Sequence, residues 1–359
     1  MKVFVITGEP SADKHASKIV SELLKRRPQA IVKGWGGSEL RNAGMEIMMD
    51  INHLSFMGIS NVIGQLPKVI KLFTNCKNQI ELFNPDLILL VDFSGFNLRI
   101  AKWAKKKGYK VDYYIAPKTW AWRSSRNKYL KKYVDHLYCI FPFEEEYFQT
   151  QGIRAIYVGN PSSGIELKNN PTSKTVVILP GSRIQEIRKV LPKLKSIISE
   201  RSDLKWVVSK MPQISITEYE KQLSGLRDID VEISEDDSNV LLSKSSVAIV
   251  TSGTATLEAA IIGCPQIVIY HTSILNYWVG RLYIKTKFIS LPNLILNEAV
   301  ADELIQNDLN SERLSTALVK LMREDEMNQM KMKYNELKSH LTDKSPELIV
   351  ADYILQQFN

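Results

Sequence analysis

Five segments of the chain place hydroxyl, acidic or cationic side chains directly after an apolar run, and four of the five also contain glycine. They are residues 8–13 (GEPSAD), 92–97 (DFSGFN), 117–126 (PKTWAWRSSR), 179–183 (LPGSR) and 251–258 (TSGTATLE). An apolar run that leads through small polar residues into an amphipathic stretch is typical of a strand followed by a helix. Ligands of parallel α/β sheets bind just beyond the carboxyl ends of the strands, so we expect the chemistry in these loops.

Asp92 directly follows the apolar run 87–91 (LILLV). At the carboxyl end of a buried strand, partial burial raises the pKa of a carboxyl group toward the range of a general base. We therefore predict that Asp92 is catalytic. The alternative is a structural helix start, in which Asn97 caps a helix over residues 98–107.

The first segment permits an anion or sugar site at a helix start. Gly8 allows a tight turn, and Ser11 or Asp13 can cap the helix that follows. A plain capped turn explains the same residues equally well. The pattern is not GxGxxG, which argues against a nicotinamide dinucleotide.

Two tryptophans and two arginines share the segment 117–126: Trp120, Trp122, Arg123 and Arg126. Tryptophan faces stack on sugars or line an acyl groove, and arginine pairs with phosphate. The alternative is that both rings fill the core. In an extended loop, however, their spacing would place them on opposite sides.

Two further loops are suited to a diphosphate. In the first, backbone N–H groups at Gly181 and Ser182, together with Arg183, can address phosphate oxygens, with Glu186 in the next helix. The second offers small and hydroxyl residues and an acid one turn inside the helix: Ser252, Gly253, Thr254, Thr256 and Glu258. A capped helix explains each turn singly. The pair, without a Walker lysine, favours a nucleotide-sugar diphosphate over ATP.

No metal or hydrolase signature accompanies these loops. The five histidines are scattered without HExxH spacing, and no DxD follows a predicted strand. The three cysteines are far apart, and GxSxG is absent. We expect a metal-independent mechanism without a cofactor, in a reducing cytoplasmic setting.

Strands alternating with helices place the chain in the α/β class, with two Rossmann-like halves built on parallel sheets. Strands are predicted at residues 3–7, 86–92, 111–115, 136–140, 175–179, 206–209, 247–251 and 266–270. The 359 residues suit two domains, and the polar segment 162–173 is the best linker. We expect domains at 1–165 and 166–340, with a C-terminal helical segment at 341–359.

Positive charge is concentrated in the first half. Residues 1–160 carry 24 basic and 14 acidic side chains, whereas residues 161–359 carry 23 and 25. Residues 99–132 alone hold 12 lysines and arginines against Asp112. Such a face indicates an anionic partner: nucleic acid, a membrane surface or a phosphorylated substrate.

The stretch 56–73 has helical apolar spacing (Ile59, Val62, Ile63, Leu66, Ile70, Phe73), most often a core stripe. Lys68 and Lys71 keep a membrane-surface helix as the alternative. The chain begins without a signal-peptide pattern. The uncharged run 259–280 contains too many polar residues for a membrane span.

Taken in order, these motifs resemble lipid-A-disaccharide synthases, glycosyltransferases of the GT-B fold, nearly end to end. The shared motifs are Gly8-Glu9-x-Ser11-x-Asp13, Met57-Gly58, Asp92-x-x-x-Phe96-Asn97, Pro117-x-x-Trp120-Ala121-Trp122-Arg123, Pro142-Phe143-Glu144, Leu179-Pro180-Gly181-Ser182-Arg183-x-x-Glu186, Ser252-Gly253-Thr254-x-Thr256-x-Glu258 and Ser290-Leu291-Pro292-Asn293. The chain departs from the family at Ala12, where members often have Gly. It also departs at Gly95, where many have a second Asp, and at Asn160, where many have His.

The resemblance implies inverting transfer of a diacylglucosamine unit from UDP-2,3-diacylglucosamine to the 6-hydroxyl of 2,3-diacylglucosamine 1-phosphate. Asp92 would be the base, and Arg183 with the helix start at 252–256 would stabilise the departing diphosphate. Glu258 would hold the ribose, and Gly8, Glu9, Ser11, Asp13 and Asn293 would join the donor site. The second domain would hold the UDP-sugar and the first the acceptor.

The resemblance also implies a peripheral position on the cytoplasmic face of the inner membrane, with Trp120, Trp122, Arg123, Arg126, Lys68 and Lys71 facing acceptor and lipid. No nucleic-acid partner is implied, and the oligomeric state is left open. Rival interpretations are another UDP-sugar enzyme, such as a UDP-N-acetylglucosamine 2-epimerase or a peptidoglycan glycosyltransferase, and a nucleic-acid-binding protein.

Overall fold

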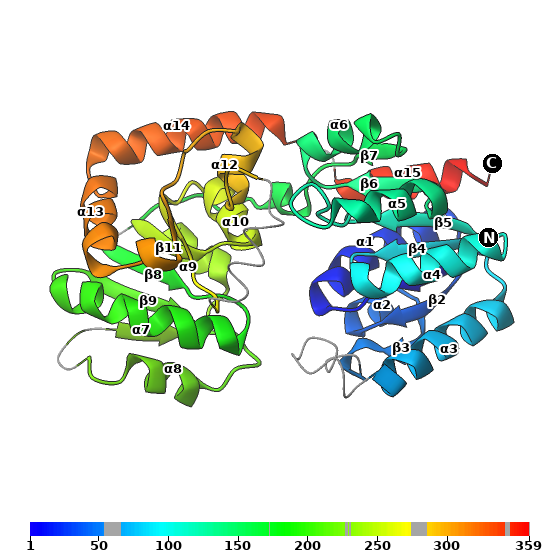
Figure 1. The fold of residues 1–359 in the computed structure, drawn as a ribbon, viewed down its shortest axis with the longest axis horizontal. Coiled ribbons are helices and arrows are strands. Elements are labelled where there is room, and N and C mark those ends of the chain that lie inside the picture. Colours follow the sequence, from blue (N-terminus) through cyan, green and yellow to red (C-terminus); the bar gives the residue numbers. More distant parts are fainter. Residues whose placement is uncertain are drawn as a thin grey trace. The chain divides into compact units, whose positions relative to one another are not determined.

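The structure is a computed structural model that describes residues 1–53, 66–171, 173–226, 229, 231–273, 286–341 and 345–358. The motif Met57-Gly58 and the apolar positions Ile59, Val62 and Ile63 lie outside the described residues. The chain divides into two compact units, one of Met1–Pro161 with Thr342–Asn359 and one of Ser162–Leu341 (Figure 1).

Unit 1 is built on a fully parallel sheet, in which seven strands are described: β1 (Lys2–Ile6), β2 (Ile31–Gly36), β3 (Glu46–Asp50), β4 (Leu87–Val91), β5 (Lys110–Tyr114), β6 (His136–Cys139) and β7 (Ala155–Tyr157). Their order across the sheet is β3-β2-β1-β4-β5-β6-β7. The apolar runs form central strands because both faces of a parallel sheet are covered by helices.

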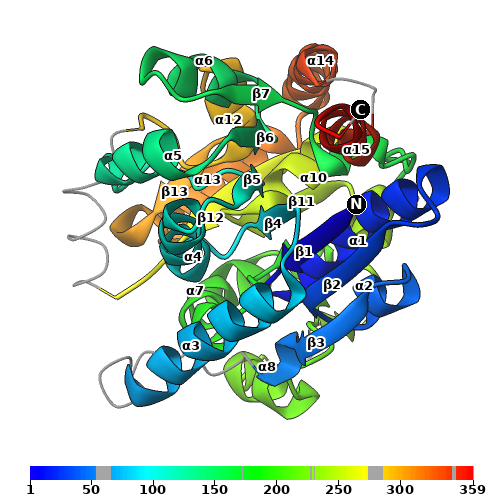
Figure 2. The ribbon, with the colours of Figure 1, turned by 90° about the vertical axis from the view of Figure 1, so that its right-hand side faces the viewer.

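The helices of unit 1 lie in two layers. They are α1 (Pro10–Arg26), α2 (Ser38–Asn42), α3 (Leu66–Phe83), α4 (Ser94–Lys106), α5 (Asn127–Tyr133), α6 (Pro142–Thr150) and α15 (Pro346–Gln356). Val3 and Val5 of β1 pack with α1 and α15, whereas Phe4 and Ile6 pack with α3 and α4. Figure 2 shows α1 and α4 on opposite sides of β1 and β4.

The last helix, α15, belongs to unit 1 although it follows unit 2 in sequence. It packs along α1, where Arg26 pairs with Asp352 and Lys18 lies 3.5 Å from Glu347. Beyond the helix, Gln357 Nε2 donates to the buried carboxylate of Asp112 on β5 (2.7 Å).

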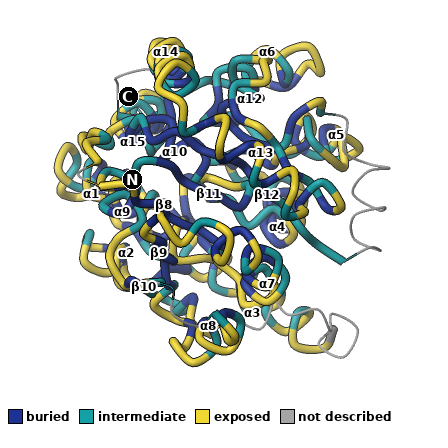
Figure 3. Tube along the Cα trace, turned by 90° about the vertical axis from the view of Figure 1, so that its left-hand side faces the viewer, coloured by how far each residue is buried: buried dark blue, intermediate teal, exposed yellow. Residues whose placement is uncertain are grey.

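Unit 2 repeats this architecture. Its described strands are β8 (Thr175–Leu179), β9 (Lys205–Ser209), β10 (Val231–Ser234), β11 (Val247–Thr251), β12 (Gln266–Tyr270) and β13 (Glu303–Ile305), in the order β10-β9-β8-β11-β12-β13. Its described helices include α7 (Ile184–Glu200), α8 (Ile216–Leu223), α9 (Ser238–Lys244), α10 (Thr254–Ile262), α12 (Leu291–Leu296), α13 (Ser311–Leu321) and α14 (Glu324–His340). Figure 3 shows the central strands buried and the outer sides of α7 and α8 exposed.

The strand order reverses beside the first strand of each unit. In unit 1 the chain moves outward from β1 to β3 and then returns to the other side of β1 as β4; in unit 2, β8 and β11 are related in the same way. Such a switch point separates the loops at the carboxyl ends and opens a crevice for a ligand. Four of the five predicted segments follow these four strands.

The predicted strands are confirmed within about two residues at their ends. The helix predicted at 98–107 instead begins at Ser94, because the chain turns sharply at Asp92 and Phe93. The described part of the run 259–280 forms the end of α10 and β12. Within the described ranges, no helix combines the length and apolar composition that a bilayer span requires.

Candidate functional site

Asn97 ties together the carboxyl ends of β1 and β4. Its buried Nδ2 lies 2.8 Å from the carbonyl oxygen of Asp92, 3.3 Å from that of Val91 and 3.5 Å from that of Ile6. The hydroxyl of Tyr113 on β5 also donates to the carbonyl of Asp92. Asn97 therefore does not cap α4 by its side chain, but fixes the backbone that carries Asp92.

Asp92 and Phe93 both have left-handed backbones, with φ of 46° and 49°. Non-glycine residues rarely adopt this region, and such strain often marks functional sites. The turn brings the Phe93 ring over Gly8, where an added Cβ atom would lie 2.3 Å from the ring. Gly8 is therefore required by the close approach of Phe93.

The carboxyl group of Asp92 is half-buried beside groups of both charges. Burial raises its pKa above the usual value, and the negative charge of Glu9 raises it further, while Lys118 opposes both effects. Lys118 comes from the loop after β5, and Glu9 from the loop after β1. Three neighbouring strand ends thus set the proton affinity of Asp92.

The two tryptophans of the loop after β5 have different environments. Trp120 is half-buried: its indole N–H donates to Glu144 on α6 (2.8 Å) and its ring packs edge-on against Phe143. Trp122 is 44% exposed, with the guanidinium groups of Arg123 and Arg126 lying 4.3 Å and 5.9 Å from its ring centre. The exposed ring and its two cations form a surface that we call the Trp122 face.

A hydrogen bond connects the Trp122 face to the turn after β4, which carries Asp92. Arg126 Nη1 donates to the hydroxyl of Ser94, two residues beyond Asp92 (3.0 Å). The loop leaves β5 through Ile115, a β-branched residue with φ of 61°. Since β-branched residues are genuine outliers there, tertiary contacts must hold this turn.

Asp13 has a different position from the one predicted. Its carboxylate is buried and accepts the backbone N–H of Gly37 (2.6 Å) and of Glu39 (3.0 Å), at the start of α2. An added Cβ atom on Gly37 would lie 2.8 Å from this carboxylate. Asp13 thus joins α1 to the start of α2, and its contact with the donor stays a prediction. Glu9 and Ser11, in contrast, are exposed at the start of α1.

In unit 2, the turn after β8 is closed by Glu186. Gly181 has φ of 115°, and the Glu186 carboxylate accepts the N–H groups of Ser182 (2.9 Å) and Arg183 (3.3 Å). The Arg183 guanidinium lies 3.3 Å from the same carboxylate, and its side chain is 73% exposed. A diphosphate at this turn would compete with Glu186 for these donors, whereas Arg183 is placed to reach it.

The turn after β11 combines exposed residues with a buried residue, Thr256, that holds them in place. Gly253 and Thr254 are exposed and Glu258 is half-buried. Thr256 is fully buried: its hydroxyl donates to the carbonyl of Gly253 (2.8 Å) and accepts the N–H of Leu291 (3.2 Å). Ser252 donates to the carbonyl of Ile289 (2.8 Å). The Thr256 hydroxyl thus fixes the backbone of this turn, and its contact with the donor stays a prediction.

Asn293 also has its hydrogen-bond partners within unit 2, and its contact with the donor stays a prediction. Its side chain is fully buried, donating to the carbonyl of Ala301 (2.8 Å) and to Glu303 (2.9 Å), and accepting the N–H groups of Val300 and Ala301. Glu303 also accepts N–H groups from the segment before α12. Both ends of the Asn293 amide are therefore used within unit 2.

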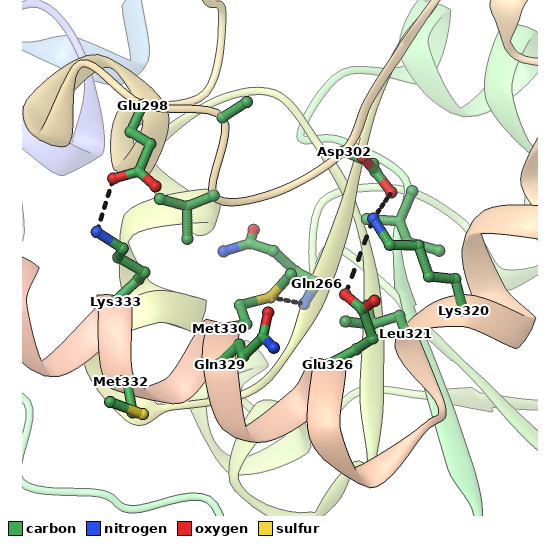
Figure 4. Close-up of a pocket in the computed structure, with 13 residues that line it drawn as sticks. Gln266, Glu298, Asp302, Lys320, Leu321, Glu326, Gln329, Met330, Met332 and Lys333 are labelled. Carbon is green, nitrogen blue, oxygen red and sulfur yellow. Dashed lines mark hydrogen bonds and ion pairs between the residues drawn. The ribbon is translucent and has the colours of Figure 1, made fainter.

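Two cavities lie away from these turns. One of about 350 Å³ is at the amino end of β12, beneath α14, where Glu298 pairs with Lys333 and Lys320 lies between Asp302 and Glu326 (Figure 4). The other, of about 450 Å³, is in unit 1 between β3 and α3, and Lys68 and Lys71 line it. On α3, Cys76 and Ile80 are in the core, while Ile70 is 57% exposed.

Fold comparison defines the class of protein. The calicheamicin glycosyltransferase superposes with a TM-score of 0.63 at 13% identity, covering 99% of this chain and 97% of that one. A UDP-GlcNAc 2-epimerase of Neisseria meningitidis, solved bound to UDP-GlcNAc, gives 0.62 at 12% identity, covering 99% and 100%. Two such α/β units with parallel sheets are the GT-B fold of glycosyltransferases.

Sequence comparison identifies the family, which a fold shared by glycosyltransferases and epimerases does not. The family of lipid-A-disaccharide synthetases matches residues 3–354. The lipid-A-disaccharide synthase of Myxococcus xanthus is 36% identical over 332 residues, covering 88% of this chain and 86% of that protein. The chain belongs to the lipid-A-disaccharide synthetase family, and it is an enzyme of lipid A disaccharide synthesis.

Sequence reasoning assigned no role to four residues that shape the site: Phe93, Lys118, Glu144 and Glu303. The first three lie in segments or motifs that the sequence singled out, but Glu303 does not. Glu144 follows Phe141-Pro142-Phe143, and an acid three residues after a helix N-cap signals a capping box. That signal predicts the local cap, but not the contact with Trp120, 24 residues earlier. Phe93 and Lys118 act through neighbouring strand ends, which local spacing does not reveal.

The contact of Phe93 with Gly8 predicts a sharp loss of activity in Gly8→Ala. The new methyl group must displace the ring and with it the backbone of Asp92, so kcat/KM for disaccharide formation is expected to fall at least about tenfold. The matched control is Gly95→Ala in the exposed first turn of α4, where an added Cβ meets no atom within 4 Å. Equal activity of the two variants would show that the packing of Phe93 on Gly8 does not position Asp92.

Proposed function

We propose that the enzyme transfers the diacylglucosamine unit of UDP-2,3-diacylglucosamine to the 6-hydroxyl of 2,3-diacylglucosamine 1-phosphate, with inversion and release of UDP. The observation that carries the proposal is the match of the family over residues 3–354, with an acidic residue of raised pKa at the switch point of unit 1. Both proposed substrates are anionic, in agreement with the positive charge of the chain.

Asp92 is the proposed general base. In an inverting transfer the hydroxyl loses its proton as its oxygen attacks the anomeric carbon, so a general base must accept that proton, and a carboxylate can do so. The raised pKa makes Asp92 a stronger base than an exposed carboxylate, and the fixed backbone restricts where the carboxylate can lie. Glu9 would keep the proton affinity of Asp92 high in this role.

The donor diphosphate is assigned to unit 2. Arg183 and the exposed tip at Gly253 and Thr254 would compensate the charge that develops on UDP as the glycosidic bond breaks. Ser182 and Ser252 would complete the site, with Glu258 at the ribose. The UDP-GlcNAc bound to the N. meningitidis epimerase supports a UDP-sugar site on this fold.

The acceptor is assigned to the Trp122 face of unit 1, where Arg123 and Arg126 would pair with its 1-phosphate. Lys68, Lys71 and the exposed Ile70 on α3 would contact the headgroups and upper chains of an anionic bilayer. The enzyme would then work peripherally, on the cytoplasmic face of the inner membrane.

Asp92→Asn tests the base directly. Asparagine tolerates the left-handed backbone, so the turn is retained while the proton acceptor is lost. We expect disaccharide 1-phosphate formation, followed by mass detection with both lipid substrates, to fall about 10²–10⁴-fold. UDP affinity measured by calorimetry should change less than about twofold. Activity within about tenfold of the parent would rule out Asp92 as the base.

The charges around Asp92 predict opposite shifts of the pH profile. Removing the negative charge in Glu9→Gln lowers the pKa of Asp92, so the acid limb of kcat/KM moves to lower pH. Removing the positive charge in Lys118→Gln raises that pKa and moves the limb to higher pH. Shifts in the same direction, or none, would mean that the limb reports a different group.

Charge reversal on α3 tests the membrane contact. Lys68→Glu combined with Lys71→Glu should weaken binding to anionic phospholipid vesicles roughly tenfold or more, because each well-placed cation contributes about 1 kcal/mol. The control combines Lys14→Glu with Lys25→Glu, which changes the same charge on exposed positions of α1. Equal loss in both variants would indicate attraction by net charge rather than a docking face.

A further inference from the structure

Glu144 is a fully buried carboxyl group that joins two elements of unit 1. Within its own chain segment it accepts the N–H groups of Ile140 and Phe141, both at 3.1 Å, and so caps the start of α6. From the loop after β5 it accepts the indole N–H of Trp120 at 2.8 Å. Capping alone would need neither the complete burial nor the third donor.

The three donors require a carboxylate rather than an amide at this position. A carboxylate has two oxygens and about four acceptor sites, whereas a glutamine side chain has one acceptor oxygen and an NH₂ group that would face other donors. Replacement by glutamine must therefore leave at least one buried N–H group without a partner, which is costly. The site is built for an anion.

Holding that anion costs stability. Burial raises the pKa of Glu144 to about 7, against the opposing effects of its three N–H donors and of Lys118, the charged group that faces it from the loop after β5. Because the folded state binds this proton more tightly than the unfolded chain, the free energy of unfolding falls as pH rises from the ordinary range toward 7. Stability alone therefore does not explain why an ionisable carboxyl group occupies this buried position.

A second residue of α6, Tyr147, also forms hydrogen bonds with the loop after β5, which carries Trp120. The Tyr147 hydroxyl, one turn beyond Glu144, donates to the carbonyl of Thr119 (3.1 Å) and accepts from Asn127 Nδ2 (2.9 Å). Both ends of residues 119–127 are therefore bound to α6. Between these anchors lie Trp122, Arg123 and Arg126, which form the exposed Trp122 face.

We propose that Glu144 is a positioning residue for the acceptor: through the indole N–H of Trp120, its carboxylate fixes the loop that presents the Trp122 face. The inference rests on the proposed role of that face in binding the acceptor. Glu144 itself touches neither substrate. Its effect should fall on the acceptor KM and pass through Trp120, which a capping role for α6 would not require.

A double-mutant cycle with Glu144→Gln and Trp120→Phe tests the proposal in the full-length enzyme. Each single variant should raise the acceptor KM about tenfold and leave the donor KM within about twofold, and the double variant should be no worse than either. The control is Trp206→Phe in unit 2, which also loses a buried indole hydrogen bond, to the carbonyl of Arg201 (3.1 Å). It should leave the acceptor KM unchanged.

The outcomes distinguish a failure of the Glu144 proposal from a failure of the proposed acceptor site. If Trp120→Phe raises the acceptor KM but Glu144→Gln does not, or if their effects add, Glu144 does not act through Trp120 and the proposal is wrong. If Trp120→Phe and Trp122→Ala both leave the acceptor KM unchanged, the face does not bind the acceptor and the proposed function of this loop fails first. If Glu144→Gln does not fold, Trp120→Phe with Glu144→Asp replaces it in the cycle.

Discussion

The geometry of unit 1 depends on the way the chain leaves β4. Two consecutive left-handed residues, Asp92 and Phe93, cost on the order of 1–3 kcal/mol each. The hydrogen bonds that Asn97 and Tyr113 make to the Asp92 carbonyl offset roughly 0.5–1.5 kcal/mol each, so that this carbonyl oxygen accepts two donors. The same turn places the Phe93 ring on Gly8 and orients the carboxylate of Asp92. It also makes α4 begin at Ser94, four residues before the start that the sequence predicts. The general-base proposal therefore rests on contacts from three strand ends rather than on one side chain.

The sequence predicts the parts of this site that arise from local pattern. The apolar run 87–91 predicts a buried strand, and the acid after it predicts a group at the carboxyl end, where the structure places Asp92. It could not predict that Asp13 would accept a hydrogen bond from the backbone of Gly37, or that Asn293 would donate one to Glu303. Each of these hydrogen bonds forms only when separate elements pack together. A short polar side chain near a helix start looks the same in sequence whether it binds a ligand or a neighbouring backbone.

Unit 2 shows how the buried layer supports the exposed turns. Gln266, the first residue of β12, donates to the carbonyl of Thr256 (2.8 Å) and to the hydroxyl of Tyr334 on α14 (3.0 Å). Thr256 in turn holds Gly253 and Leu291. The start of α10 is thereby fixed from within the unit, so Gly253 and Thr254 can remain exposed without losing their geometry. Preorganised donors of this kind need little rearrangement when charge develops on a leaving group.

The positive charge of residues 99–132 is not evenly available to a ligand. Lys105 and Lys107 pair with Asp135 and Glu81, which leaves them largely compensated. Arg123 and Arg126, in contrast, share the ring of Trp122, and the pKa of Arg126 is lowered by burial first and then by the charge of Arg123. Two guanidinium groups held this close repel each other, and an anion between them would relieve the repulsion. This repulsion supports the proposal that the acceptor phosphate binds at the Trp122 face, and Glu144 and Tyr147 hold the loop that carries this face.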